Sequence, residues 1–430
     1  MDDPNIVVDE SARLIPCTFN YTFMASMINI DSYIYSPMRF VVLIHVPRED
    51  VQGFVDDWRN RRPQDVKILL HPHISAETVN GAQFFAAVDA KKMSSVTDYC
   101  RLLEVQGAKV QLISIYGDRS TSRELKKFYD DKSRADRHNG KAKIRMLRGV
   151  GSTKSLKLLP LIDWRTDDKE LKVETGVSYL VKTDNNTILF DLSLNNNEED
   201  PSPLLQNMRK LGITIKDIDT IFITHNHGDH VGGGKWAKDK TFSATGHQEP
   251  LGGIKVYVPT HMTYPGLKPV YARNPIVIGK GIASTGTIAN GMYSMGFIEE
   301  QGLAVNVDGK GIVLIVGCGH QTVPRLLERA RLLFDEPIYG VIGGLHYPVM
   351  GGPREVYGYA IHKYAGTGKP PWEHITVEEL EANIELLKGL NLKLVALSPH
   401  DSSDVSMKAF RDAFPNGYRE LRVGESIVVE

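Results

Sequence analysis

The stretch Thr220-Ile-Phe-Ile-Thr224-His225-Asn-His227-Gly-Asp229-His230-Val-Gly-Gly233 decides the fold of the larger part of this chain. Its first four residues are β-branched or aromatic, which is typical of a buried strand. Four side chains that can bind a metal ion then follow within six positions. Folding alone does not require so many histidines after a hydrophobic strand, so the stretch predicts a metal site on a loop at a strand end.

The spacing of these four side chains fits two adjacent metal ions. Imidazole and carboxylate groups on one loop can face neighbouring cations, with His225 and His227 turned to one, and Asp229 and His230 turned to the other. The glycines in the stretch let the backbone turn sharply beside the site. The alternative is a solvated loop that carries four polar residues and no metal.

Three later histidines stand in the same context, because His320, His346 and His400 each follow a short apolar run. Loops at one edge of a sheet converge in layered folds, so we expect these residues to reach the same site. His346 can be a ligand, a proton donor, a substrate contact or a satisfied core histidine. Four other histidines have no strand before them, and we interpret them as surface or loop residues: His247, His261, His362 and His374.

The histidine motif resembles the hallmark HxHxDH of the metallo-β-lactamase superfamily, and Thr187-Ile-Leu-Phe190-Asp191 resembles the strand ending in aspartate that supports the motif from behind. Residues 158–429 resemble one branch, the metal-dependent hydrolases that include the dihydropterin-aminobenzene phosphate synthase of methanopterin biosynthesis. The matching segments are Glu174-Thr-Gly-Val-Ser178, Leu204-Leu-Gln-Asn207, the THNHGDHVGG block, Gly317-Cys-Gly-His320, Gly343-Gly-Leu-His346 and Pro399-His400.

The resemblance implies a ligand set, which is His225, His227 and His320 for one metal and Asp229, His230 and His400 for the other. It implies that Asp191 supports these ligands without touching a metal. We place Cys318 in the same supporting position, because a buried cysteine at a strand end is usually a small hydrophobe. The chain has GCGH, GGLHY and HDSS where the branch has GCSH, GGFHL and HCTG, and these departures bear on the substrate more than on the metal.

The pattern of elements predicts an α+β chain with two domains. Residues 156–430 alternate short strands with helices, which suits an αββα metallo-β-lactamase-like catalytic domain. In one of these helices, Thr376 and Glu379 form a capping box and Gly389 ends the helix. Residues 348–371, rich in Gly, Pro and Tyr, form a flap or a plain surface loop, and candidate substrate contacts in and beside them are Tyr357, Tyr359 and Trp372.

The order before that domain is βαββαβ, which predicts a small ferredoxin-like domain over residues 38–117. Its strands are expected at 40–44, 66–70, 83–88 and 110–115, with helices at 48–58 and 94–105 between them. His71 and His73 form a ligand pair or, as we expect, a surface turn. Residues 1–37 are interpreted as an arm, and 118–155 as a basic linker with a helix over 122–135.

Composition excludes several classes of protein. Of 430 residues, 42% are hydrophobic and 24% charged, which excludes disordered, collagen-like and coiled-coil chains. The 51 basic and 52 acidic residues leave a net charge of −1, so no overall charge favours nucleic acid or membrane. Residues 118–148 hold eleven basic and five acidic side chains, but aromatic residues between them are few, so nucleic acid is not the expected partner.

The three cysteines are far apart and odd in number, which argues against a disulfide framework and favours the cytoplasm. The start, Met1-Asp-Asp-Pro4, has no signal-peptide pattern, and the longest apolar runs are too short to cross a membrane. We therefore expect a small-molecule substrate, no membrane partner, and a homo-oligomer formed through the N-terminal domain.

These features together favour a dinuclear metal-dependent hydrolase that uses a metal-activated water on a small anionic ester, lactone or phosphoester. Zinc is the expected metal, and histidine and carboxylate ligands also suit Mn or Fe. Asp229 would position the nucleophile, and a free His346 would protonate the leaving group. Two alternatives stay open: a transferase or synthase that displaces pyrophosphate, and a non-catalytic metal-binding sensor whose output is the ferredoxin-like domain. A nuclease is the third alternative, and only the basic linker supports it.

Overall fold

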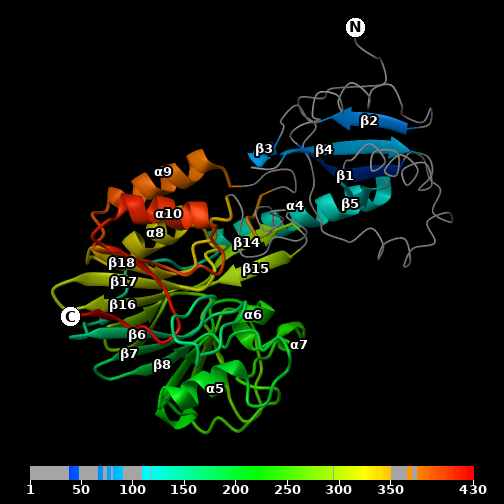
Figure 1. The fold of residues 1–430 in the computed structure, drawn as a ribbon. Helices are drawn as coiled ribbons and strands as arrows, with labels where there is room; N and C mark the ends of the chain where they lie inside the picture. Colours follow the sequence, from blue (N-terminus) through cyan, green and yellow to red (C-terminus); the bar gives the residue numbers. More distant parts are fainter. Residues whose placement is uncertain are drawn as a thin grey trace. The chain divides into compact units, whose positions relative to one another are not determined.

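The computed structural model describes residues 38–47, 66–70, 75–78, 81–90, 109–116, 118–293, 295–349, 366–369 and 375–430 (Figure 1). The chain forms two units, Met1–Asp130 with Lys369–His374, and Asp131–Gly368 with Ile375–Glu430. The predicted arm, the histidine pair at 71 and 73, His362, His374 and the aromatic side chains expected at the flap lie outside the described residues.

The described residues of the first unit form an antiparallel sheet, in which the strand order is β2-β4-β1-β5 and β3 pairs with β4. Its strands are β1 (Met38–Pro47), β2 (Val66–Leu70), β3 (Ser75–Thr78), β4 (Gly81–Ala90) and β5 (Lys109–Tyr116). The four predicted strands are present, and β3 is an addition. Their order is the one that a ferredoxin-like βαββαβ chain produces. The two expected helices lie outside the described residues, so this fold assignment stays a prediction.

Helix α4 (Asp118–Gly140) covers most of the stretch predicted as a linker. It is longer at both ends than the helix expected over 122–135, because its charged residues give no apolar period from which to read the ends. From Asp131 onward its residues belong to the second unit.

The second unit is built on two seven-stranded sheets and a hairpin. One sheet has the order β11 (Val270–Tyr271), β10 (Lys255–Val258), β9 (Thr220–Phe222), β8 (Thr187–Phe190), β7 (Ser178–Thr183), β6 (Leu156–Ile162) and β21 (Ile427–Val429). The other has the order β12 (Ile276–Gly279), β13 (Ile282–Ser284), β16 (Leu303–Val307), β17 (Gly311–Val316), β18 (Ile338–Gly343), β19 (Leu394–Leu397) and β20 (Tyr418–Glu420). The hairpin is β14 (Ile288–Met292) and β15 (Gly296–Glu300).

Three apolar layers hold this unit together. Between the sheets, the rings of Tyr179, Phe190 and Phe222 stack with centroids 5.7 and 5.6 Å apart, and all three side chains are fully buried. The outer face of the β17 sheet is covered by α8 (Val323–Leu333), α9 (Val377–Lys388) and α10 (Asp404–Ala413), as Figure 1 shows. Helix α5 (Pro203–Lys210) packs on the outer face of the other sheet. The layers are therefore helix, sheet, sheet, helix, as predicted.

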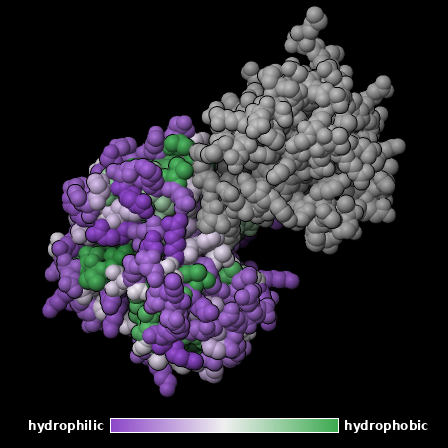
Figure 2. Space-filling view, in the orientation of Figure 1, coloured by the Kyte–Doolittle hydropathy of each residue, from purple (hydrophilic) through white to green (hydrophobic). Residues whose placement is uncertain are grey.

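The visible surface of this unit is mostly hydrophilic, and hydrophobic residues appear on it in separate patches (Figure 2). This distribution agrees with the apolar side chains being collected in the three layers. Among the described residues, no helix is long and apolar enough to span a bilayer.

Local sequence signals worked best where a hydrophobic run was long or a cap was present. The sequence predicts nine strands in this unit, and all are found with ends that differ by at most two residues. The predicted ranges are 156–162, 177–182, 188–190, 220–223, 254–258, 303–307, 312–316, 340–342 and 394–396. Helix α9 begins after Thr376, whose hydroxyl accepts a hydrogen bond from the Glu379 N–H at 3.2 Å, and its cap is Gly389. Strands such as β14 and β20 were missed, because Gly, Asn and charged residues interrupt their apolar pattern.

Replacing Leu314 by Ala tests the layer beneath α8 to α10. Leu314 lies in β17 and is fully buried, so the cavity should lower the free energy of unfolding of this unit by about 2–5 kcal/mol. Val428→Ala is the matched control, since Val428 is 51% exposed and should change it by less than about 0.5 kcal/mol. Urea unfolding followed by circular dichroism measures both, and equal shifts would contradict the packing described.

Candidate metal centre

The candidate site lies where parallel strands from both sheets end. Strands β8 and β9 run parallel in one sheet, and β17, β18 and β19 run parallel in the other. Parallel strands bring their carboxyl ends to one edge, and ligand sites of layered folds commonly lie there. Asp191 follows β8, and the HxHxDH stretch follows β9. The second sheet supplies Cys318 and His320 after β17, His346 after β18 and His400 after β19.

The first group of candidate ligands is His225, His227 and His320, whose ring nitrogens lie within 4.8 Å of one another. The Nε2 atom of His225 is 3.1 Å from Nδ1 of His227. His320 donates its Nδ1–H to the carbonyl oxygen of Gly366 at 2.9 Å, which leaves its Nε2 lone pair available. Two of the three come from the β9 loop and one from the β17 loop, so the chain places them together through the packing of the sheets.

The second group is Asp229, His230, Cys318 and His400, with one possible ligand atom from each within 4.8 Å of the others. The Nε2 atom of His230 lies 2.9 Å from Sγ of Cys318. The side chain of Asp229 is 21% exposed, and its Oδ2 atom lies 3.2 Å from Nε2 of His400. The sulfur of Cys318 therefore lies among the candidate ligand atoms, although we had placed it beside them.

Asp191 orients both groups from behind. Its carboxylate accepts hydrogen bonds from the N–H and the hydroxyl of Thr224, each at 2.7 Å, and from Nδ1–H of His230 at 2.7 Å. Because the Thr224 hydroxyl donates to Asp191, it can only accept at 3.0 Å from Nδ1–H of His225. The Nε2 atom of a neutral His225 ring is then left without a proton, which is the state that binds a metal. His230 reaches the same state once its ring gives up the Nε2 proton.

His400 has a different environment. The indole N–H of Trp164 donates to Nδ1 of His400 at 2.7 Å, and an indole N–H cannot accept. A neutral His400 ring therefore carries its proton on Nε2, facing Asp229. Behind it, Asp163 is fully buried and accepts hydrogen bonds from Tyr179 at 2.9 Å and Ser398 at 3.0 Å. In this arrangement Nε2–H of His400 can donate to Asp229. His400 can offer an Nε2 lone pair only if its proton moves to Nδ1 and the bond from Trp164 is lost.

His346 lies beside the first group of candidate ligands. Among the described residues, it is a member of neither of the two groups. Its ring centroid is 4.8 Å from that of His320, and its Nδ1 is 4.0 Å from Oδ1 of Asp401. It has a positive φ of 54°, and only 5% of it is exposed. Gly366 borders both rings, because a Cβ at this glycine would lie 2.7 Å from Cε1 of His346 and 2.9 Å from Cε1 of His320.

Burial and neighbouring charges set the protonation of the site. Burial lowers the pKa of His225 and His320 well below the usual value, and that of His227 to about 4, so these imidazoles are neutral near pH 7. Burial also lowers the pKa of His230, but the carboxylates of Asp191 and Asp229 outweigh it and raise the pKa to about 9. In the absence of a metal, the first group is thus neutral and the second is an ion-paired cluster.

The loop from 317 to 321 is held by a buried acid from the hairpin. Glu300 ends β15 and accepts backbone hydrogen bonds from Cys318 at 3.2 Å, Gly319 at 2.9 Å and Gln321 at 3.3 Å. Burial raises the pKa of Glu300 to about 7. Sequence reasoning missed Glu300, Trp164, Asp163 and Gly366, because each lies far along the chain from the ligands that it supports and no spacing marks it.

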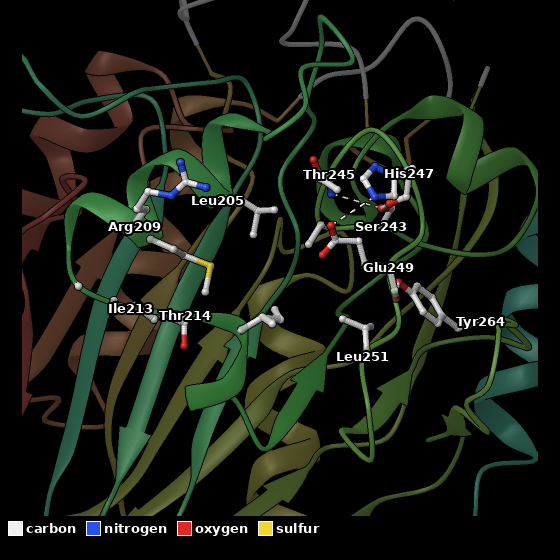
Figure 3. Close-up of a pocket in the computed structure, with 14 residues that line it drawn as sticks. Leu205, Arg209, Ile213, Thr214, Ser243, Thr245, His247, Glu249, Leu251 and Tyr264 are labelled. Atoms are coloured by element: carbon white, nitrogen blue, oxygen red, sulfur yellow. Dashed lines mark hydrogen bonds and ion pairs between the residues drawn. The ribbon is translucent and has the colours of Figure 1, made fainter.

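A separate cavity of about 350 Å³ lies away from these groups (Figure 3). Side chains of α5 and the turn after it, including Leu205 and Arg209, face the loop that carries Ser243, His247 and Glu249. None of the candidate ligands lines it. As predicted, His247 and His261 lie on exposed loops outside both groups.

The sequence of the second unit matches a known family. Residues 171–277 match the model of the metallo-beta-lactamase superfamily, and they include the HxHxDH stretch and Asp191. This part of the chain is therefore similar to the superfamily that the motif indicated.

A curated relative is the 7,8-dihydropterin-6-methyl-4-(beta-D-ribofuranosyl)-aminobenzene-5'-phosphate synthase of Methanocaldococcus jannaschii, 26% identical in an alignment 243 residues long that covers 47% of this chain and 81% of the relative. Among solved structures, the metallo-beta-lactamase fold protein YhfI of Bacillus subtilis has a TM-score of 0.39, 13% identity and coverage of 64% of this chain and 100% of that one. A quorum-quenching N-acyl homoserine lactone lactonase has a TM-score of 0.23, 17% identity and coverage of 38% and 73%.

Replacing Gly317 by Ala tests the close packing around Asp191. The added Cβ would overlap Oγ1 of Thr224 and lie 3.2 Å from Oδ2 of Asp191, so we expect a loss of about 1–3 kcal/mol in the free energy of unfolding. Gly302→Ala is the matched control, because its Cβ would meet its nearest neighbours at an ordinary 3.5 Å and should change stability by less than about 1 kcal/mol. Urea unfolding in EDTA compares them, and a stable Gly317→Ala variant would argue against this geometry.

Proposed function

We propose that the second unit is a dinuclear metal-dependent hydrolase acting on a small anionic ester, lactone or phosphoester. The observation that carries the proposal is the pair of adjacent ligand groups, His225, His227 and His320 beside Asp229, His230, Cys318 and His400. They meet at one sheet edge, and a carboxylate partner for His230 lies behind them. The match of residues 171–277 to the metallo-beta-lactamase superfamily supports the same proposal.

The residues of the first group fit a divalent metal. Burial lowers their pKa values, so the three rings are neutral near pH 7. The Nε2 lone pair of His225 faces Nδ1 of His227 at 3.1 Å, a distance that requires a proton or a cation between the two atoms. The second group adds a carboxylate, two imidazoles and a thiol. Imidazole and thiolate donors favour zinc over magnesium or manganese, so we propose zinc at both positions.

Metals bound in such a pair lower the pKa of a water molecule and polarise an anionic oxygen of the substrate. The residues of the chain would then orient and move protons. Asp229 is the partly exposed member of the second group, and its carboxylate can hold the attacking water and accept its proton. His346 is close to the first group but outside it, and its proton can go to the leaving group. Glu300 and Asp191 would keep the two ligand loops in register.

A second candidate function is a transferase or synthase that displaces pyrophosphate, and the named relative favours it because that protein is a synthase. The two candidates differ in the nucleophile. In a hydrolase, water attacks the substrate and its oxygen stays in the product, whereas in the synthase a second organic molecule attacks and pyrophosphate leaves. Turnover in ¹⁸O-labelled water followed by mass spectrometry separates them, since only hydrolysis labels the product.

Metal analysis tests the centre itself. Elemental analysis of the purified chain should find two zinc equivalents, and the double variant His225→Ala, His227→Ala should retain one or none, because it loses two of three ligands of the first group. The double variant His247→Ala, His261→Ala is the control and should retain two, since both histidines lie on exposed loops outside the groups. A wild-type chain that binds no metal after reconstitution would rule out the dinuclear proposal.

Catalysis has its own test. With generic phosphodiester, ester and lactone substrates, turnover should disappear in chelator and return with zinc, and Asp229→Asn should lower kcat by about 10²-fold or more at saturating zinc, because the amide cannot accept a proton. Asp239→Asn, at an exposed aspartate that ends α7 (Gly234–Lys238), should leave kcat unchanged. Binding of two metals without turnover of any substrate would favour the sensor alternative.

A further inference from the structure

The second half of helix α4 lies directly on strand β14. The side-chain amide of Asn139 donates to the carbonyl of Ala289 at 2.9 Å, and its oxygen accepts from the N–H of Ala289 at 2.8 Å. Gly291 allows this approach, because a Cβ there would lie 2.5 Å from the backbone nitrogen of Lys132. This part of the stretch expected to be a linker is therefore fitted to the hairpin of the second unit.

Lys132 connects this helix to two other segments. Its ammonium group donates to Oδ1 of Asn290 at 3.1 Å and to the carbonyl oxygen of Gly368 at 3.0 Å. The side chain is half-buried, and burial together with the charge of Arg325 lowers its pKa. Hydrogen bonds from a charged donor are stronger than neutral ones, so Lys132 holds Asn290 and the 366–368 loop together.

Asn290 holds His320 directly, and the 366–368 loop holds it through Gly366. The side-chain amide of Asn290 donates to the carbonyl oxygen of His320 at 2.8 Å, which fixes the backbone of this residue. Gly366 accepts from Nδ1–H of His320 at 2.9 Å, which fixes the orientation of the ring. Gly368 also packs against Asn290, because a Cβ at this glycine would overlap the Asn290 amide. Lys132 thus acts on the main chain and the ring of one candidate ligand through two different partners.

We propose that Lys132 is a positioning residue for the first metal position, acting through Asn290 and Gly366 on His320. The inference rests on the proposed function, since it concerns a metal held by His225, His227 and His320. Partners that orient a ligand histidine commonly contribute 10–100-fold to metal affinity. Lys132 touches neither group of ligands. It contributes by holding β14 at a fixed distance from the 366–368 loop, which contacts the His320 ring.

The alternative is that Lys132 only attaches α4 to the hairpin. Other residues of the helix already do this, because Asn139 bonds to Ala289 and the guanidinium of Arg134 lies 3.8 Å above the ring of Phe297. Arg134 faces the same hairpin from the same helix and makes no bond to Asn290 or to the 366–368 loop among the described residues. It therefore provides a matched control for the loss of a cationic side chain.

The experiment measures zinc affinity in the full-length chain by competition with a chromophoric chelator, together with thermal unfolding in EDTA. Lys132→Met should weaken one of the two zinc equivalents by about 10–100-fold, leaving the other unchanged. Lys132→Arg, which keeps a cationic donor in reach of both oxygens, should restore most of the affinity. Arg134→Met should leave both equivalents at the wild-type affinity.

Two results would overturn the inference. One is a Lys132→Met variant that binds zinc as tightly as the wild type. The other is an Arg134→Met variant weakened as much as Lys132→Met, because this would show that Lys132 only attaches the helix. If Lys132→Met does not fold, Asn290→Ser removes the same connection from the other side and should weaken one equivalent in the same way. A wild-type chain that binds no zinc would instead refute the proposed function and this inference with it, so the two failures are distinguishable.

Discussion

The candidate site depends on the buried carboxylate of Asp191. This side chain is fully buried, and burial raises its pKa, so its charged form requires nearby donors. It finds them in the backbone and hydroxyl of Thr224 and in the ring of His230. These bonds connect the end of β8 to the end of β9 and set the direction of the histidine loop. The orientation of the HxHxDH side chains is thus a consequence of satisfying one buried charge.

The second constraint is that the two sheets must pack before the site exists. The β9 loop supplies His225 and His227, whereas His320 comes from the other sheet. Strand β17 is buried along its whole length, so its end is placed by the core rather than by the loop. Glu300 and Asn290, from the two strands of one hairpin, then hold the loop that carries Cys318 and His320. Stability of the core and geometry of the site are therefore coupled.

The sequence was sufficient where its signals were local. A hydrophobic run followed by four potential ligands predicted the β9 loop, and three later runs ending in histidine predicted the rest of the sheet edge. It was insufficient where the cause is long-range. Nothing near Cys318 indicates that its sulfur lies 2.9 Å from His230, 88 positions away, and nothing near Lys132 indicates its bond to Gly368. Such contacts follow from the packing of two sheets and a helix, which no periodicity in a single segment encodes.

The central claim is that two metal ions lie side by side at the edge where the strands of both sheets end. The most direct measurement is a crystal structure of the zinc-loaded chain, with diffraction data recorded on both sides of the zinc absorption edge. The account predicts two anomalous peaks, one within bonding distance of His225, His227 and His320, and the other beside Asp229 and His230. A fully loaded crystal with a single peak, or with peaks away from these residues, would contradict it.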